Sequence, residues 1–145
     1  MDAKEYLNQV KKLDLQIHNK LIEKQQWKDI ALGITANVFA ERIQASGAKD
    51  KVASAVEKCV DMEAEIDALI DRLIDVKKEV IQTIECLDSP IQYDLLHKKY
   101  IQFLTFEQIA EIYGRDYTTV TTAHGRALRS VQAILEGKND ERKTD

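Results

Sequence analysis

Residues 105–135, TFEQIAEIYGRDYTTVTTAHGRALRSVQAIL, contain two helix starts separated by a glycine turn. Thr105 and Gln108 have the spacing of a capping box, in which each side chain bonds the backbone N–H of the other residue. Gly114 suits the left-handed conformation that ends a helix, and Asp116 is a good N-cap for the next helix. A short helix, a glycine-centred turn and a longer helix are typical of a helix-turn-helix.

The apolar spacing within this segment predicts which side of each helix faces inward. The expected inward residues are Phe106, Ile109, Ala110 and Ile112 in the first helix, and Val120, His124 or Ala123, Ala127, Val131 and Ile134 or Leu135 in the second. A strand is the alternative for DYTTVTT, because Thr, Val and Tyr favour strands. The sequence offers no second strand to pair with it, so a helix is the preferred interpretation.

The outward positions of the second helix predict a surface that contacts DNA. The N-terminal part of such a helix enters the major groove, where threonine hydroxyls can bond phosphates or base edges and threonine methyls can touch thymine. A glutamate there would repel phosphate, whereas glycine lets the backbone approach DNA or a neighbouring element. Ordinary solvated side chains are the alternative for the arginines, and Arg129 could also pair with Glu111. The expected DNA-binding residues are Arg115, Tyr117, Thr118, Thr121, Thr122, Gly125, Arg126 and Arg129.

The chain before this segment predicts two long helices. Apolar residues recur every three or four positions in two segments, and in the later segment this pattern is sustained for about five heptads. The stripe of the earlier segment comprises Tyr6, Val10, Leu13, Ile17, Leu21, Trp27, Ile30, Ile34 and Val38. The stripe of the later segment comprises Val52, Val56, Cys59, Met62, Ile66, Leu69, Leu73, Val76, Val80, Ile84 and Leu87. Between them, Ser46-Gly47 indicates a stop and Asp50 a new N-cap. Ser89, Pro90 and Gln92 indicate the start of the next helix.

These patterns predict an all-α fold made of a long antiparallel helical hairpin followed by a small helix-turn-helix bundle. The predicted domains are a hairpin over 1–88, a DNA-binding domain over 89–136 and a disordered polar tail over 137–145. A hairpin buries only one stripe per helix, so we expect it to pair with a second copy at this seam, as a homodimer or higher oligomer. The alternative is a monomer whose hairpin folds back on the C-terminal domain.

Composition narrows the class of protein. The 145 residues are 32% charged and 6% aromatic, which is typical of a helix-rich chain. No apolar run approaches the roughly 18 residues of a membrane span, and the first residues lack the apolar core of a signal peptide, so we expect a cytoplasmic protein without a membrane partner. The histidines and cysteines lack metal-ligand spacing, and there is neither a nucleophile with its base nor a phosphate loop. We therefore predict no cofactor and no enzyme activity.

Charge is distributed unevenly along the chain. The formal net charge is −4, yet residues 90–135 hold five basic and four acidic residues, a net charge of +1. Residues 1–89 hold 13 basic against 17 acidic residues. A single copy should therefore bind DNA weakly, with a modest dependence on salt, and useful affinity would need a dimer or a larger partner.

Residues 93–135 resemble region four of bacterial sigma factors. The matching residues are Glu107-Gln108-Ile109-Ala110, Gly114, Thr119-Val120 and Arg126-Ala127, in that order. The whole chain, including VFAERIQASGAKDKVASAVEKCVDMEAEID, is similar to a family of phage and prophage proteins from Gram-positive bacteria whose relatives include late-transcription activators and autolysin regulators. The resemblance implies a phage-encoded regulator in the bacterial host cytoplasm that binds double-stranded DNA. The chain lacks the other sigma regions, so it is not a complete sigma factor.

The resemblance also implies which residues touch DNA, and it leaves two other functions open. It nominates Tyr117, Thr118, Thr121, Thr122 and Arg126, although Thr121 and Thr122 stand where the family commonly has Lys or Arg and Ser. Because sigma region four also contacts polymerase, the second hypothesis is a protein-interaction module that docks on host RNA polymerase. The third is a component of phage DNA packaging, similar to a small terminase, because such proteins join a helix-turn-helix to an oligomerising coil.

Overall fold

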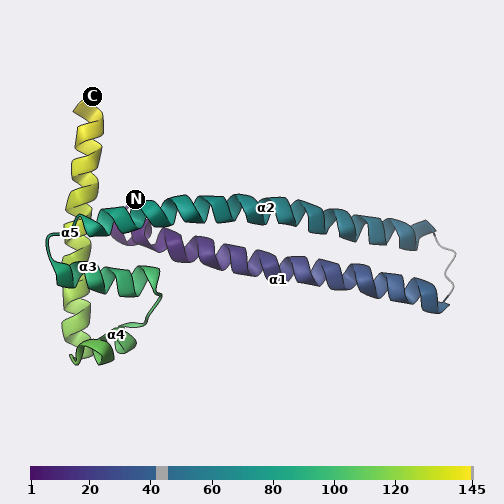
Figure 1. Ribbon diagram of the computed structural model, residues 1–145, viewed down its shortest axis with the longest axis horizontal. Helices are drawn as coiled ribbons and strands as arrows, with labels where there is room; N and C mark the ends of the chain where they lie inside the picture. Colours follow the sequence, from purple (N-terminus) through teal and green to yellow (C-terminus); the bar gives the residue numbers. More distant parts are fainter. Residues whose placement is uncertain (42–45, 145) are drawn as a thin grey trace. The chain divides into compact units, whose positions relative to one another are not determined.

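The computed structural model describes the backbone of residues 1–41 and 46–144, and the side chains of residues 1–33 and 49–138 (Figure 1). The described residues are helical, with short connections and no strand. The elements are α1 (Ala3–Glu41), α2 (Ser46–Glu85), α3 (Pro90–Leu96), the π-helix η1 (His97–Ile101), α4 (Phe106–Tyr113) and α5 (Tyr117–Thr144). The all-α fold is thus confirmed, and the strand alternative for DYTTVTT is wrong.

Two predicted helix boundaries differ from the structure. Helix α2 begins at Ser46, so Gly47 and Asp50 lie inside this helix and Asp50 is not its N-cap. The predicted turn falls mainly on residues 42–45, which lie outside the described residues. Helix α5 continues to Thr144, through the segment for which the sequence predicts a disordered tail. Both helices therefore extend into polar segments that contain no periodic pattern of apolar residues.

The chain forms two compact units, which divide it differently from the predicted boundary at residues 88 and 89. The hairpin unit is residues 13–72, and the C-terminal unit combines residues 1–12 with residues 73–145. The first turns of α1 and the last turns of α2 belong to the C-terminal unit because their side chains pack into the same core as those of α5. The helix-turn-helix segment thus shares its core with the start of α1 and the end of α2.

In the hairpin unit, α1 and α2 run antiparallel and bury part of each predicted stripe (Figure 1). Two ion pairs fix their register, Lys20 Nζ to Glu65 Oε2 at 3.0 Å and Lys24 Nζ to Glu63 Oε1 at 2.7 Å. The buried side chains of this unit are Leu13, Ile17, Ala55, Met62 and Ile66. Three residues expected to be buried are instead exposed, namely Leu21, Ile30 and Val56. Ile34 and Val38 lie outside the described side chains.

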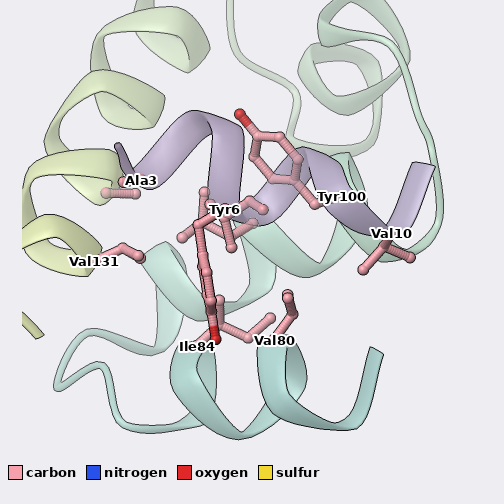
Figure 2. Close-up of a cluster of buried hydrophobic side chains, with 10 residues drawn as sticks. Ala3, Tyr6, Val10, Val80, Ile84, Tyr100 and Val131 are labelled. Atoms are coloured by element: carbon pink, nitrogen blue, oxygen red, sulfur yellow. The ribbon is translucent and has the colours of Figure 1, made fainter. Parts of the chain in front are cut away.

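The C-terminal unit has a core built from four helices and the π-helix (Figure 2). Its buried members are Ala3, Tyr6, Leu7 and Val10 of α1, Val80 and Ile84 of α2, Leu96 of α3, Tyr100 of η1, and Ala127 and Val131 of α5. Polar contacts join the same helices. Thr83 Oγ1 lies 2.9 Å from the Tyr6 hydroxyl and accepts a hydrogen bond from Lys138 Nζ at 3.1 Å. The Ala3 N–H donates to Gln132 Oε1 at 2.8 Å, which ties the start of α1 to α5.

A second, smaller core holds α4 against α3 and α5. It consists of Leu95, Ile109, Ala110 and Val120, with Leu104, Phe106, Tyr113 and Ala123 packed around them. The predicted inward positions of α4 are confirmed for Ile109 and Ala110, whereas the prediction for Ile112 is wrong because its side chain is 57% exposed. The spacing of α4 places Ile112 on the outer flank, and no other described element covers it.

The π-helix η1 and the turn after it have no signal in the sequence. The Gln102 N–H bonds His97 O at 3.0 Å, five residues back, and Phe103 then adopts φ +60°. A left-handed conformation at a residue with a Cβ costs about 1–2 kcal/mol. Phe103 also packs against the core of the C-terminal unit. Tertiary packing therefore holds a turn that local propensity disfavours.

No helix among the described residues combines the length and the apolar character needed to cross a membrane.

Candidate nucleic-acid interface

Hydrogen bonds fix the start of α4 and the turn between α4 and α5. The capping box is confirmed, with Thr105 N–H bonded to Gln108 Oε1 at 2.9 Å and Gln108 N–H bonded to Thr105 Oγ1 at 3.1 Å. Gly114 takes the left-handed conformation with φ 63° and ψ 36°. The Thr119 N–H donates to Asp116 Oδ1 at 2.8 Å, and this bond lowers the pKa of the Asp116 carboxyl. These caps set where α5 begins and which of its sides faces outward.

The inner side of α5 is confirmed by burial of Val120, His124, Ala127 and Val131. His124 Nε2 lies 2.7 Å from the Tyr100 hydroxyl, and the two rings stack with centroids 5.7 Å apart. Burial and the nearby charge of Lys99 lower the pKa of His124 to about 4, so its ring is neutral at neutral pH. His124 therefore belongs to the interior packing of the segment and takes no part in an outward surface.

The predicted DNA-binding residues lie on the outer side of α5 or in the turn before it. At about 100° per residue, Thr118, Thr122, Gly125 and Arg129 fall within roughly 60° of one another and opposite the buried Val120. Six of the eight predicted residues are exposed, and Thr121 and Gly125 are half-buried. We call the four residues Thr118, Thr122, Gly125 and Arg129 the outer stripe. Tyr117 and Thr121 lie on one flank of the outer stripe, Arg126 lies on the other, and Arg115 precedes the helix.

The hydroxyl groups on this side differ in their availability. Thr121 Oγ1 donates to Thr118 O at 3.1 Å within the same helix, so its proton is already used. The hydrogen bonds of the described residues do not involve the hydroxyls of Thr118 and Thr122, and both side chains are exposed. Thr118 and Thr122 are therefore the two threonines best able to donate a hydrogen bond to an incoming group.

The first five turns of α5 carry two positive charges, those of Arg126 and Arg129, and no negative charge. No Asp or Glu occurs from residue 117 to residue 135, although the chain has 25 acidic residues. The ion pairs of the described residues involve neither Arg126 nor Arg129, so the alternative pairing of Arg129 with Glu111 is not formed. Both guanidinium groups are exposed and able to bind an anion.

A cavity beside the turn was not expected from the sequence. Its volume is about 350 Å³, and it is lined by Ile91, Leu95, Tyr113, Arg115, Thr119, Val120 and Ala123. The Tyr113 hydroxyl donates to Asp94 Oδ2, and Lys98 Nζ bonds Asp94 Oδ1 at 3.0 Å, so a polar network supports this wall. Ile91 is 68% exposed directly after Pro90. The sequence does not indicate this cavity, because its lining residues come from α3, α4, α5 and the turn between the last two.

The described residues hold no group of three or more His, Cys, Asp or Glu side chains placed to bind a metal ion. Both cysteines are free thiols. No protein-family model, curated protein sequence or solved structure matches this chain.

Proposed function

We propose that this chain is a phage-encoded regulator of transcription that binds double-stranded DNA through the outer stripe of α5. The observation that carries the proposal is the absence of any carboxylate from residue 117 to residue 135 on a helix whose outer side is uncovered in its own unit. Its resemblance to sigma region four supports the same surface. Such a protein would act in the cytoplasm of the bacterial host.

The side chains of the outer stripe match the chemistry of a DNA groove. Thr118 and Thr122 offer free hydroxyls to phosphate oxygens or base edges, and Arg129 offers a guanidinium to phosphate or guanine. Gly125 has no side chain, and a Cβ added there would meet no atom within 4 Å, so the structure holds no neighbouring element that requires a glycine. A close approach of DNA would account for a residue that weakens the helix by about 1 kcal/mol relative to alanine.

The direct test is binding of full-length protein to labelled duplexes from its own phage genome, with a scrambled duplex of equal length for comparison. Thr118→Glu and Thr122→Glu each place a carboxylate against phosphate, so we expect affinity at least tenfold weaker. Ser54→Glu adds the same charge at an exposed position of α2 and should bind as the wild type does. Unchanged binding by both threonine variants, or no binding by the wild type at roughly 50 mM salt, would contradict the proposal.

The cavity beside the turn favours a second candidate function, docking on host RNA polymerase or another protein. Its lining is mainly apolar, and the exposed Ile91 at its edge could contact an apolar side chain of a partner. Ile91→Asp should then abolish a complex with polymerase and leave DNA affinity unchanged. The third candidate, a DNA-packaging component, predicts a large closed ring, which a mass measurement distinguishes from a dimer.

A further inference from the structure

The two sides of the hairpin unit have different chemistry. One side is a groove of about 600 Å³ between the helices, lined by the polar or charged residues Gln16, Asn19, Lys20, Glu23, Glu65 and Arg72 and by Ala68 and Leu69. The other side carries aliphatic residues of α2 that nothing in this unit covers. Val56 is 49% exposed, Val60 is 59% exposed and Ile70 is 38% exposed. Ile74, one turn further along the same continuous helix, is the first exposed isoleucine of the C-terminal unit and is 46% exposed.

These aliphatic residues form a second stripe on α2, separate from the stripe that packs against α1. Positions 56, 60, 63, 67, 70 and 74 are spaced by four and three residues alternately, so they follow one side of the helix. Val56 and Val60 stand at one end, Ile70 and Ile74 at the other, and Glu63 and Asp67 in the middle. Met62 and Ile66, which belong to the packed seam, are buried. The second stripe is thus available after the hairpin has closed.

The second stripe is complementary to itself when a copy runs in the opposite direction. Its pattern is symmetric about residue 65, so an antiparallel copy places Val60 beside the partner's Ile70 and Val56 beside the partner's Ile74. Shifting the copies by one helical turn would place aliphatic groups against carboxylates. A surface that contacts its own equivalent in this way is the kind used in twofold-symmetric dimers.

Helix α1 contributes side chains to the side of the hairpin that carries the second stripe. Its lysines balance the negative charge of Glu63 and Asp67 in the middle of that stripe. Lys24 pairs with Glu63, and Leu21, Lys28 and Leu32 lie within about 80° of Lys24 around the helix axis. Each protomer therefore brings the carboxylates of Glu63 and Asp67 together with two lysines. Two copies can meet at this centre without a net excess of negative charge.

The available area is close to the minimum for a stable interface. From Val56 to Ile74, α2 rises about 27 Å, and two helices each about 10 Å wide present roughly 540 Å² per protomer over that length. Specific interfaces bury upward of about 500 Å² per partner. The contact therefore suffices for a dimer that depends on protein concentration.

We infer that a second copy of this chain docks on the second stripe, with α2 antiparallel to the partner's α2 about a twofold axis near residue 65. The resulting four-helix bundle is joined through this second stripe of α2 and not through the packed seam between α1 and α2, where Met62 and Ile66 are already buried within one chain. The inference does not depend on DNA binding. It would also bring two copies of α5 into one particle and so double the weak positive charge available to a duplex.

Sedimentation velocity of the full-length protein over a range of concentrations tests the oligomeric state. We expect a dimer for the wild type, and for Ile70→Glu a dissociation constant at least tenfold higher. Ile112→Glu is the control, because Ile112 is also an exposed isoleucine but lies in the C-terminal unit, away from the second stripe. It should remain dimeric. A wild-type monomer at all concentrations, a large ring, or equal dimerisation of both variants would overturn the inference.

Disulfide cross-linking tests the direction and register. In a Cys59→Ser, Cys86→Ser background, the double variant Val60→Cys, Ile70→Cys should oxidise to a covalent dimer. Positions 60 and 70 are about 15 Å apart within one helix, so they cannot bridge internally. Each single variant should stay unlinked, because the twofold symmetry places its cysteine about 15 Å from the equivalent cysteine of the partner. Efficient linking of Val60→Cys alone would indicate a parallel arrangement and overturn the inference.

Discussion

At the scale of single residues, Gly114 and Gly125 differ in the backbone conformation that they support. Gly114 has φ +63°, whereas Gly125 lies within α5, and a Cβ at either position would meet no atom within 4 Å. Conformation alone should therefore decide the outcome. We expect Gly114→Ala to lower the free energy of unfolding by about 1 kcal/mol and Gly125→Ala to raise it by about 0.5–1 kcal/mol. Urea denaturation measures both, and shifts of the same sign would contradict the expectation.

His124 makes stability depend on pH. Its pKa is lowered from 6.5 to about 4 in the folded chain, chiefly by burial. As the pH falls from about 6.5 to about 4, the unfolded chain takes up a proton that the folded chain does not, so stability is lost across this window. The full loss is at most about 3.5 kcal/mol, from about 1.4 kcal/mol per pH unit.

Urea denaturation at several pH values between 7.5 and 4 checks this expectation. His124→Gln removes the titrating ring while keeping a polar group near the Tyr100 hydroxyl, so its stability should change much less over this range. Asp94, whose pKa is lowered by its hydrogen bonds to Tyr113 and Lys98, contributes a further loss only below its ordinary value of 3.8. A wild-type slope equal to that of His124→Gln would show that His124 is not responsible.

Residue-level chemistry was the best-predicted part of this chain. The capping box at Thr105, the left-handed Gly114 and the cap at Asp116 all depend on residues within a few positions of one another, so the sequence contains their causes. The choice between Ala123 and His124 as the buried position depended on a partner, the Tyr100 hydroxyl, that lies 24 residues away in sequence. Spacing alone could only leave that choice open.

At the scale of elements, the sequence predicted helices more reliably than their ends. The stripes of α1 and α2 indicated the correct type of structure, because apolar periodicity reports directly on burial. The π-helix η1 and the left-handed Phe103 were missed because packing of Phe103 into the core, and not its local propensity, stabilises that turn. The continuation of α5 was missed for a related reason, since its polar sequence is tied to the unit through Lys138.

The contact of Lys138 gives a test of the last part of α5. Its Nζ bonds Thr83 Oγ1, and Thr83 keeps its contact with the Tyr6 hydroxyl if the lysine is removed. We therefore expect Lys138→Met, which retains much of the apolar stem, to lower the free energy of unfolding by only about 0.5–1 kcal/mol. Lys58→Met at an exposed position of α2 should have no effect. Equal values for the two variants would indicate that the bond contributes nothing to stability.

At the scale of the whole molecule, the C-terminal unit draws its core from distant parts of the chain. Ala3, Tyr6, Leu7 and Val10 come from one end, and Val80 and Ile84 come from the end of α2. The sequence predicted a domain boundary between residues 88 and 89, where the apolar pattern is interrupted. Patterns along the sequence do not reveal which distant segments share a core, and the structure divides the chain elsewhere. The sequence therefore predicted the helix-turn-helix segment but missed the elements that support it.

This shared core predicts that residues 90–135 do not fold stably when expressed alone. Removing residues 1–89 exposes Leu96, Tyr100, Ala127 and Val131, which the full chain buries. Losing the burial of even two such side chains costs about 3–6 kcal/mol, a large part of the stability of a small domain. A chimera that joins residues 1–12 to residues 73–145 through a short glycine-serine linker restores every member of this core, and we expect it to unfold cooperatively.

Circular dichroism and thermal unfolding separate the two outcomes. The fragment 90–135 should show reduced helicity and no cooperative transition, whereas the chimera should show both high helicity and a sharp transition. If the short fragment unfolds as cooperatively as the chimera, the ends of α1 and α2 are dispensable to the core. Because the chimera lacks residues 13–72 it should also be monomeric, so its affinity for DNA would report what one copy of α5 achieves without a partner.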